Sequence, residues 1–376
     1  MQFRDLKAQY LALKPQIDSA VQSVMDKGEF ILGKPVDELE KMLAEYTQRK
    51  HCITCASGTD ALQLSLMAMG VGCGDAVFTS DFTYFASSAA ASILGATVVF
   101  VDIDSKTFNI SPQALELAIE QVIREGVLTP KVIIPVDLFG LPAEYSKIIP
   151  IAEKYGLKIL EDAAQGFGSS IDKKPACSFG DISATSFFPA KPLGCYGDGG
   201  AIFVDDDMLN ARLRSLRALG KSPFDKYDNL EIGINSRLDT MQAAILIPKF
   251  KALVDFELES VNKIAEYYNQ RLCDYVITPY IPCRYISCRA QYTISLAAEC
   301  SRNRVRNALT ESKIPSMIYY PKGLHQQKAY ESMKLSDELY PNTIHASKTV
   351  LSLPIHPYMS EEEVDIISEI IKSNII

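Results

Sequence analysis

Three short segments in the first half of the chain combine residue types that could bind a phosphate group and activate an amine. The first is SGTDAL at 57–62, which follows an apolar run and opens a helical pattern. A glycine such as Gly58 lets the backbone approach a ligand closely, and the free N–H groups at a helix start bind phosphate. A capped turn without a ligand would use the same residues, so this segment alone leaves both interpretations open.

The second segment is an apolar strand, ILED at 159–162, that ends in an acid. In open α/β folds ligands bind at the carboxyl ends of the strands, so Asp162 is placed where a ligand would lie. A carboxylate there could keep a pyridinium nitrogen protonated, which makes pyridoxal 5'-phosphate (PLP) an electron sink. An acid that only caps the turn after the strand would also be an aspartate here.

The third segment is ATSFFPAKPLG at 184–194, in which Lys191 stands just past an apolar strand, in a turn of proline and glycine. A lysine on a surface loop is usually only solvated, whereas one presented between buried strands can have a lowered pKa and act as a nucleophile. Ser186 could offer a hydroxyl to a phosphate, and Gly197–Gly200 are interpreted as a hairpin turn. Together the segments supply a phosphate site, a partner for a pyridine ring and a Schiff-base lysine, the parts of PLP chemistry.

The elements that must position these residues alternate in type along the first half of the chain. Apolar runs typical of strands are separated by longer amphipathic stretches typical of helices. This alternation predicts an α/β fold of βαβ units, with a mostly parallel mixed sheet covered on both faces. The predicted strands are Cys52–Thr54, Ala76–Thr79, Thr97–Val101, Val132–Val136, Lys158–Glu161, Ala184–Phe188 and Gly200–Val204. The predicted helices between them are Asp60–Met69, Ala86–Leu94, Pro112–Glu125 and Ala143–Tyr155.

The second half of the chain indicates a smaller domain. A long helical region runs from Leu238 towards Arg271, interrupted near Pro248, and such a region can form the hinge between two domains. We predict a large PLP-binding domain at 1–254, which includes N-terminal helices, and a small C-terminal α+β domain at 255–376.

Composition restricts the class of protein. The 376 residues include 38 basic and 46 acidic side chains, a net charge of −8, without a Lys/Arg run. Neither nucleic acid nor a membrane is expected as a partner, because there is no basic face and no apolar stretch long enough to span a bilayer. The nine cysteines are scattered and the N-terminus has no secretion signal, which predicts reduced thiols in the cytoplasm. Cys52-x-x-Cys55 lies in a predicted strand without a second pair at metal-ligand spacing, so we expect no metal site.

At these segments the sequence resembles the DegT-type family of nucleotide-sugar aminotransferases. The motifs that carry the resemblance are SGTDAL at 57–62, EDAAQGFGS at 161–169, SFFPAKPLGCYGDGGAIF at 186–203 and NSRLDTMQAAIL at 235–246. It extends over essentially the whole chain, from FRDLKAQY at 3–10 to LSLPIHPY at 351–358. The resemblance implies the aspartate-aminotransferase architecture, which is fold type I of the PLP-dependent transferases.

The resemblance also implies roles for individual residues around the cofactor. Lys191 would hold PLP in a Schiff base and then move a proton between the substrate and the cofactor. Asp162 would pair with the pyridine nitrogen, and Gln165 would lie near the phenolic oxygen of the ring. Tyr84 occupies the position of the aromatic residue that stacks on the ring, with Phe82 as the weaker alternative. The residues implied to bind the phosphate are Gly58, Thr59 and Ser186.

The last motif implies a homodimer and a substrate class. Asn235 is expected to reach the phosphate of the cofactor in the neighbouring subunit, which places the active sites at the subunit interface. The motif favours a UDP-3-keto sugar, related to UDP-3-oxo-N-acetylglucosaminuronate and used in surface polysaccharide or O-antigen synthesis. The expected amino donor is L-glutamate, which leaves as 2-oxoglutarate. Residues expected near the substrate are Arg237, which could pair with a carboxylate, and Tyr319, Tyr320 and His325. Tyr319 stands where the pattern of these relatives has a histidine, which changes one substrate contact.

Other functions stay open on the sequence. The chain could act on a 4-keto nucleotide sugar or on a cyclic ketone, or it could be a sugar dehydratase. It could also be a regulatory protein that binds PLP without catalysis, because folds are reused. Lys191 argues against the dehydratase, since dehydratases of this family carry histidine there. A nicotinamide dehydrogenase is disfavoured because no GxGxxG motif follows the first strand.

Overall fold

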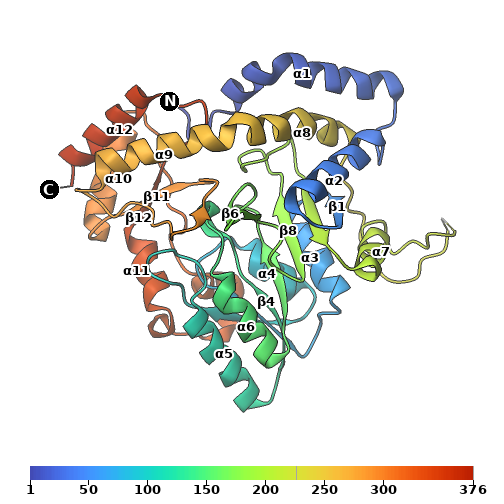
Figure 1. Cartoon of the computed structure of the whole chain (residues 1–376). Coiled ribbons are helices and arrows are strands. Elements are labelled where there is room, and N and C mark those ends of the chain that lie inside the picture. The colour runs from blue at the N-terminus through green and yellow to red at the C-terminus, as the bar shows by residue number, and fades with distance from the viewer. Residues whose placement is uncertain (226, 376) are drawn as a thin grey trace.

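A seven-stranded sheet gathers the apolar runs of the first half of the chain in the computed structural model, which describes residues 1–225 and 227–375 (Figure 1). The strands stand in the order β1-β9-β8-β5-β4-β2-β3. β9 runs antiparallel to both of its neighbours, and the other strand pairs of the sheet are parallel. The bounds are β1 His51–Cys55, β2 Asp75–Ser80, β3 Thr97–Val101, β4 Thr129–Ile134, β5 Lys158–Asp162, β8 Ile182–Ser186 and β9 Gly200–Val204. The predicted mostly parallel mixed sheet is confirmed.

Helices cover both faces of this sheet, because successive strand residues point to opposite sides and both sides are apolar. On β9, Ile202 and Val204 pack into the core under α3, α4 and α7, while Ala201 and Phe203 pack into the core under α2 and α8. α5 and α6 cover the same side as α2 and α8, over β2, β4 and β5. The bounds are α2 Lys34–Thr47, α3 Gly58–Ala68, α4 Ala86–Ile93, α5 Pro112–Glu125, α6 Tyr145–Tyr155, α7 Asp207–Leu216 and α8 Thr240–Ala252.

The long helical region of the second half differs in detail from its prediction. Helix α8 continues through Pro248, followed by a π-helical segment at Leu253–Glu257 and then by α9, Leu258–Leu272. The expected interruption near Pro248 is therefore wrong. The helix becomes irregular five residues later, at Leu253, where its turns widen to those of a π-helix. The predicted domain boundary at 254/255 falls inside this segment. N-terminal helix α1, Leu6–Lys27, lies along α8 (Figure 1).

The C-terminal part has a core of its own. The antiparallel pair β11, Tyr292–Ser295, and β12, Val350–Leu353, packs with α9 and with two further helices. These helices are α10, Glu299–Glu311, and α12, Glu361–Ser373. Residues 324–340 behave differently: Leu324, Tyr330 and Tyr340 pack on the core of the large sheet. This segment contains short 3₁₀ turns at Leu324–Gln326, Lys328–Met333 and Asp337–Leu339 and leads into α11, Pro341–Thr349.

A few short elements complete the fold. A small three-stranded sheet joins β6, Ser170–Ile171, and β7, Lys174–Pro175, to β10, Tyr285–Ile286, and a 3₁₀ turn lies at Leu138–Gly140. Within the residues that the structure describes, no helix is both long enough and apolar enough to cross a bilayer.

Candidate active site

Asp162 ends β5 at the carboxyl edge of the large sheet. Its side chain is buried, with 4% of the residue exposed. The hydroxyl of Ser87, at the start of α4, donates to Oδ2 at 2.7 Å, and the Ala164 N–H donates to Oδ1 at 3.1 Å. Burial raises the pKa of the Asp162 carboxyl, while these two hydrogen bonds and the charge of Lys191 oppose the rise. The result is a buried carboxylate that a cationic ring N–H would stabilise further.

Lys191 lies in the loop between β8 and β9. Because β8 is the sheet neighbour of β5, with Ala184 opposite Asp162, the loop leaves the sheet beside the Asp162 carboxylate. The Lys191 N–H donates to the Phe188 carbonyl oxygen at 2.8 Å, which closes the turn. Burial lowers the pKa of the Lys191 amine, and the charge of Asp162 partly opposes that effect. Lys191 makes no ion pair with a described carboxylate, so its amine is free to act as a nucleophile.

The start of α3 and the end of β8 meet in a close contact. Ser57 caps the helix, accepting a hydrogen bond from the Asp60 N–H at 3.0 Å. A Cβ atom added to Gly58 would lie 2.6 Å from the Ser186 Cβ, so only glycine fits at this position. The free N–H groups of the first helical turn, together with the Ser186 hydroxyl, form a cradle suited to phosphate. Thr59 lies in the same turn.

Gln165 links the turn after β5 to the predicted substrate tyrosines. Its Oε1 accepts a hydrogen bond from the Phe139 N–H at 2.8 Å, and its Nε2 donates to the Tyr320 hydroxyl at 3.2 Å. The Tyr320 ring stands edge-on to Phe82, with centroids 5.8 Å apart. Phe82 is only 1% exposed, whereas Tyr84 is 60% exposed. Of these two aromatic residues, Tyr84 is the one with a face free to cover a ligand.

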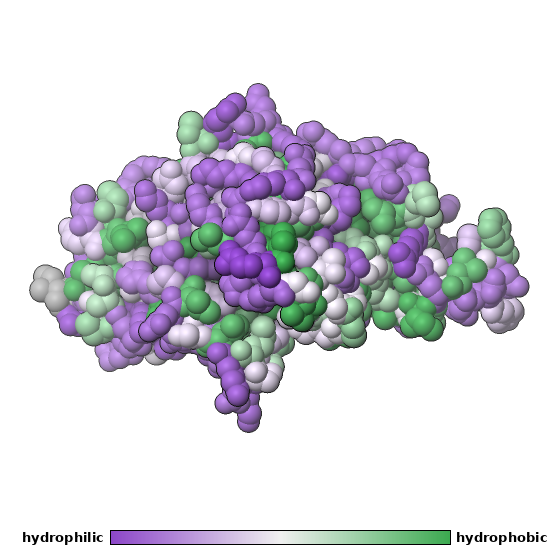
Figure 2. Space-filling view, turned by 90° about the horizontal axis from the view of Figure 1, so that it is seen from below, coloured by the Kyte–Doolittle hydropathy of each residue, from purple (hydrophilic) through white to green (hydrophobic). Residues whose placement is uncertain are grey.

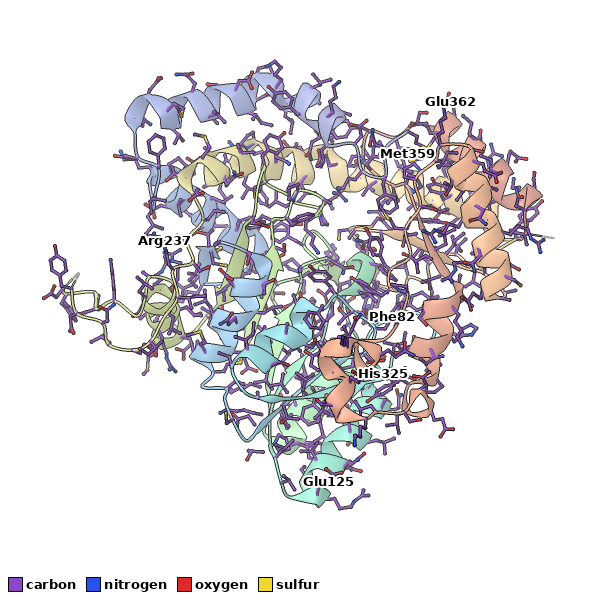
Figure 3. All side chains as sticks on the ribbon, turned by 180° about the vertical axis from the view of Figure 1, so that it is seen from behind. Phe82, Glu125, Arg237, His325, Met359 and Glu362 are labelled. Carbon is purple, nitrogen blue, oxygen red and sulfur yellow. The ribbon has the colours of Figure 1, made fainter. Side chains whose placement is uncertain are left out.

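Asn235 and Arg237 lie in a different place from these residues. They line a groove of about 380 Å³ together with Ile31, Asp198, Asp239 and Gln242, among others, and neither Lys191 nor Asp162 lines it. Between them, Ser236 donates to Asp60 Oδ2 at 2.6 Å and fixes the segment to α3. Figure 3 shows Arg237 far from Phe82 and His325. Within one chain the structure does not bring Arg237 to the tyrosines.

His325 is enclosed by two carboxylates. Nδ1 lies 2.7 Å from Asp81 Oδ2, and Nε2 lies 2.9 Å from Asp337 Oδ1. The ring stacks on Tyr340 at 4.5 Å between centroids, and 2% of the side chain is exposed. A sugar contact would require one of these bonds to break, so the geometry does not support that predicted role. Tyr319 is half-buried and contacts Phe3, with ring centroids 6.2 Å apart.

Two residues of this region were not predicted from the sequence. Ser87 bonds to Asp162, and Arg4 approaches the Lys191 loop, with Nη2 3.5 Å from the Pro192 carbonyl oxygen. Arg4 lies in FRDLKAQY at 3–10, one end of the family resemblance, but nothing in that segment indicates a partner for it. Ser87 gave no signal at all.

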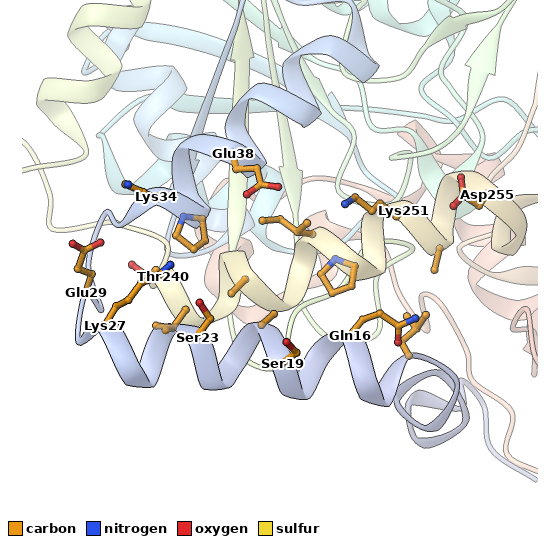
Figure 4. Close-up of a pocket in the computed structure, with 18 of the residues that line it drawn as sticks. Gln16, Ser19, Ser23, Lys27, Glu29, Lys34, Glu38, Thr240, Lys251 and Asp255 are labelled. Atoms are coloured by element: carbon orange, nitrogen blue, oxygen red, sulfur yellow. The ribbon is translucent and has the colours of Figure 1, made fainter.

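Other concave surfaces of the protein do not include these residues. A groove of about 760 Å³ between α1, α2 and α8 is lined by side chains such as Ser19, Lys27, Glu38 and Lys251 (Figure 4). A cleft of about 800 Å³ lies between α9 and the segments around β6 and β10. None of the predicted site residues lines either one.

The residues at the sheet edge fit PLP. Asp162 is a buried acid that a ring N–H would pair with, Lys191 is an amine without an ion pair, and Gly58 opens a cradle that a Cβ atom would fill. Lys191 and Asp162 act on each other's pKa, which places them in one site.

Comparisons with known proteins agree with this chemistry. The DegT/DnrJ/EryC1/StrS aminotransferase family matches residues 12–372. The chain is 43% identical to the UDP-2-acetamido-2-deoxy-3-oxo-D-glucuronate aminotransferase of Pseudomonas aeruginosa over 370 residues, 98% of each chain. It is 41% identical to a protein of Geobacillus stearothermophilus named pleiotropic regulatory protein over 364 residues, 96% of this chain and 94% of that one.

Solved structures share the fold over almost the whole chain. A DegT DnrJ EryC1 StrS aminotransferase from Brucella abortus superposes with a TM-score of 0.96 at 46% identity, covering 99% of both chains. NtdA from Bacillus subtilis, solved with the bound cofactor pyridoxamine phosphate, gives a TM-score of 0.87 at 28% identity, covering 96% of this chain and 81% of that one. The predicted fold type I architecture and cofactor are confirmed. The chain belongs to the DegT/DnrJ/EryC1/StrS aminotransferase family and is a PLP-dependent aminotransferase.

Proposed function

We propose that this enzyme transfers an amino group from L-glutamate to the 3-keto group of a UDP-linked sugar, a UDP-3-oxo-N-acetylglucosaminuronate or a close analogue. The product would enter surface polysaccharide synthesis, and the free state of all nine cysteines suits the cytoplasm. The observation that carries the proposal is the Lys191–Asp162 pair at the sheet edge, where each group shifts the pKa of the other. The sugar class is supported by the 43% identical relative from Pseudomonas aeruginosa.

In this proposal each side chain has a defined task. When bound, PLP supplies an electron sink for the carbon that loses or gains the amino group. Asp162 accepts a hydrogen bond from the ring nitrogen and keeps it charged. Lys191, as a free amine, would move a proton between the substrate carbon and the cofactor within each half of the cycle. Gly58, Thr59 and Ser186 hold the phosphate, Gln165 faces the phenolic oxygen and Tyr84 covers the ring.

Burial gives Lys191 its suitability as a base. The lowered pKa of its amine leaves a larger neutral fraction near neutral pH than an exposed lysine has.

We further propose that two chains form the active unit, with Asn235 reaching the phosphate bound by the neighbouring subunit. Asn235 is exposed in the single chain, and the segment between α7 and α8 projects from the body of the molecule (Figure 1). Figure 2 shows apolar side chains at that projecting end, where Phe224 is 96% and Ile232 is 90% exposed. Exposed apolar side chains of this kind mark protein interfaces. Arg237, beside Asn235, would then contact the sugar of the neighbouring site.

The dimer is tested by light scattering of the purified protein and of a double variant, Phe224→Asp with Ile232→Asp. We expect the mass of two chains for the wild type and of one chain for the variant, with loss of activity. A wild type that scatters as one chain at micromolar concentration and is fully active would refute the role of Asn235.

The catalytic proposal is tested with the purified enzyme, Lys191→Ala and the exposed control Lys147→Ala. We expect the visible absorbance band of the bound cofactor to be lost on adding L-glutamate, with 2-oxoglutarate released, and to return on adding the UDP-3-keto sugar. Lys191→Ala should lose turnover by several orders of magnitude while it keeps its circular dichroism, and Lys147→Ala should match the wild type. Multiple turnovers by Lys191→Ala without an added amine would refute the mechanism.

A second candidate function follows from the relative named pleiotropic regulatory protein, which is 41% identical. A protein with that role could bind PLP without turning over. The same assay separates the two functions, because a purely regulatory protein would not release 2-oxoglutarate in amounts exceeding the enzyme. Ammonia release would instead indicate a dehydratase, and a panel of 4-keto sugars and cyclic ketones tests the alternative acceptors.

A further inference from the structure

Arg4 brings a second cation to the loop that carries Lys191. Its Nη2 lies 3.5 Å from the carbonyl oxygen of Pro192, the residue that follows the lysine. The preceding residue, Phe3, contacts the ring of Tyr319. The N-terminal segment is therefore held between the loop that carries the amine and one of the predicted substrate tyrosines.

The chain does not neutralise this guanidinium. Arg4 makes no ion pair with a described carboxylate, and the main opposite charge acting on it is Glu257. The Glu257 carboxylate already accepts hydrogen bonds from Gln9 at 2.8 Å and from Tyr358 at 2.6 Å. A guanidinium has five N–H donors, and Arg4 uses one of them in a long hydrogen bond.

An unpaired guanidinium beside the Lys191 loop favours an anionic ligand. Burial lowers the pKa of Arg4, and the charge of Arg4 adds to the effect of burial in lowering the pKa of Lys191. An anion bound at Arg4 would relieve the penalty of the unpaired guanidinium, because a desolvated charge is costly unless it is paired. A carboxylate fits best, since the planar guanidinium fork matches its two oxygens.

We propose that Arg4 binds the α-carboxylate of the amino donor, an assignment that rests on the proposed transfer from L-glutamate. The α-carboxylate is one bond from the carbon that reacts beside Lys191, so its anchor must lie next to that lysine. Arg4 satisfies this condition, and Arg237, in the groove with Asn235, does not within one chain. Arg4 thus orients the donor carbon towards the amine, and Arg237 is left to the sugar.

The test compares Arg4→Gln, Arg4→Lys and Lys7→Gln, a control on the exposed side of α1. The donor half of the cycle is measured by the absorbance change with L-glutamate, and the acceptor half by the reverse change with the keto sugar. Binding of glutarate and of UDP to the PLP-loaded protein is measured by calorimetry, which does not depend on turnover.

For Arg4→Gln we expect KM for L-glutamate and Kd for glutarate to rise roughly 10- to 100-fold, the range for one lost charge-assisted interaction. The rate at saturating L-glutamate should fall much less, and Kd for UDP should stay within twofold. Arg4→Lys keeps the charge but not the fork, so its values should lie between those of Arg4→Gln and the wild type. Lys7→Gln should match the wild type.

Two results would overturn the proposal, and they differ from each other. If the wild type responds to L-glutamate and Arg4→Gln shows the same KM and the same glutarate affinity, Arg4 is not the anchor although the proposed function stands. If the wild type does not respond to L-glutamate at all, the proposed donor fails and this assignment fails with it. If Arg4→Gln does not fold, Arg4→Lys decides, since wild-type KM and glutarate affinity in that variant would exclude the bidentate anchor.

Discussion

Lys249 is buried in α8 without a hydrogen-bond partner, and replacing it by methionine should stabilise the protein. The side chain is 1% exposed, and its ammonium lies 4.5 Å from the centroid of the Tyr196 ring. Burial lowers the pKa of Lys249 to about 8, from 10.5 for a free lysine. That difference corresponds to about 3 kcal/mol of destabilisation at neutral pH, since each pKa unit is about 1.4 kcal/mol.

Methionine keeps nearly the same volume and removes the charge. The contact with Tyr196 offsets part of the cost, because a cation over an aromatic ring contributes roughly 0.5–2 kcal/mol. A thioether beside the same ring recovers some of that contact. We therefore expect Lys249→Met to raise the free energy of unfolding by about 1–3 kcal/mol at pH 7.

The stability gained by Lys249→Met must decrease as the pH rises. The folded chain releases the Lys249 proton near pH 8, whereas the unfolded chain keeps it to about 10.5. Between these values the unfolded state binds more protons, so the stability of the wild type rises with pH. The buried lysine therefore destabilises the folded chain fully below pH 8, and this destabilisation disappears between pH 8 and 10.5. The advantage of methionine should therefore shrink across that window.

Urea denaturation at pH 7 and pH 9.5 measures both effects, at one protein concentration and with saturating PLP, because bound ligand and assembly also shift stability. The matched control is Lys251→Met, an exposed position of the same helix, which should stay within about 0.5 kcal/mol of the wild type. A Lys249→Met variant that is less stable than the wild type at pH 7, or that gains equally at both pH values, would refute the assignment of a buried unpaired amine.

Three further predictions concern the contacts around the site. Gly58→Ala should weaken PLP binding at least tenfold in a titration of the apoprotein, because the new Cβ would lie 2.6 Å from the Ser186 Cβ. The control Gly72→Ala should bind PLP normally, because the atom nearest to its Cβ, the Leu94 carbonyl oxygen, is 3.9 Å away. Ser87→Ala removes a hydrogen bond that lowers the pKa of Asp162, so PLP should be released on acidification at a higher pH than from the wild type; an unchanged pH of release would count against the bond. His325→Leu should lower the free energy of unfolding by roughly 3–5 kcal/mol in urea denaturation, since it leaves the Asp81 carboxylate buried without the imidazole partner. His325→Gln should lower it less. Equal stability of the wild type and both variants would contradict the contact between His325 and Asp81.

The sequence allowed the strands and the chemistry at their ends to be predicted because both depend on local patterns. Asp162 and Lys191 each follow an apolar run, and the rule that ligands bind at the carboxyl edge places them on the same side of the sheet. The strand that precedes Lys191 ends at Ser186 rather than at the predicted Phe188, since residues 187–199 leave the sheet to form the loop. The hairpin interpretation of Gly197–Gly200 described only the last part of this loop.

Contacts between distant residues could not be predicted in the same way. Arg4 and Pro192 are 188 residues apart, and Asp81 and His325 are 244 apart. No periodicity or spacing links such pairs, since the folded backbone alone brings them together. The same limit applies to His325, which we expected near the substrate and which the fold encloses between two carboxylates.

Burial, more than the surrounding charges, explains why the Lys191 loop can carry a reactive amine. Arg4 lies against the loop at Pro192, and the Lys249 ammonium lies over the ring of Tyr196 in the same loop. Glu257, the last residue of the π-helical segment before α9, acts on both cations. Neither cation has a described carboxylate partner, and the charge of Arg4 lowers the pKa of Lys191. Burial has the largest effect in lowering the pKa of Lys191 and the charge of Arg4 adds to it, while the charge of Asp162 limits how far the pKa falls. An anionic substrate bound beside Arg4 would give that guanidinium a partner, so substrate binding would use a charge that the folded chain leaves unpaired.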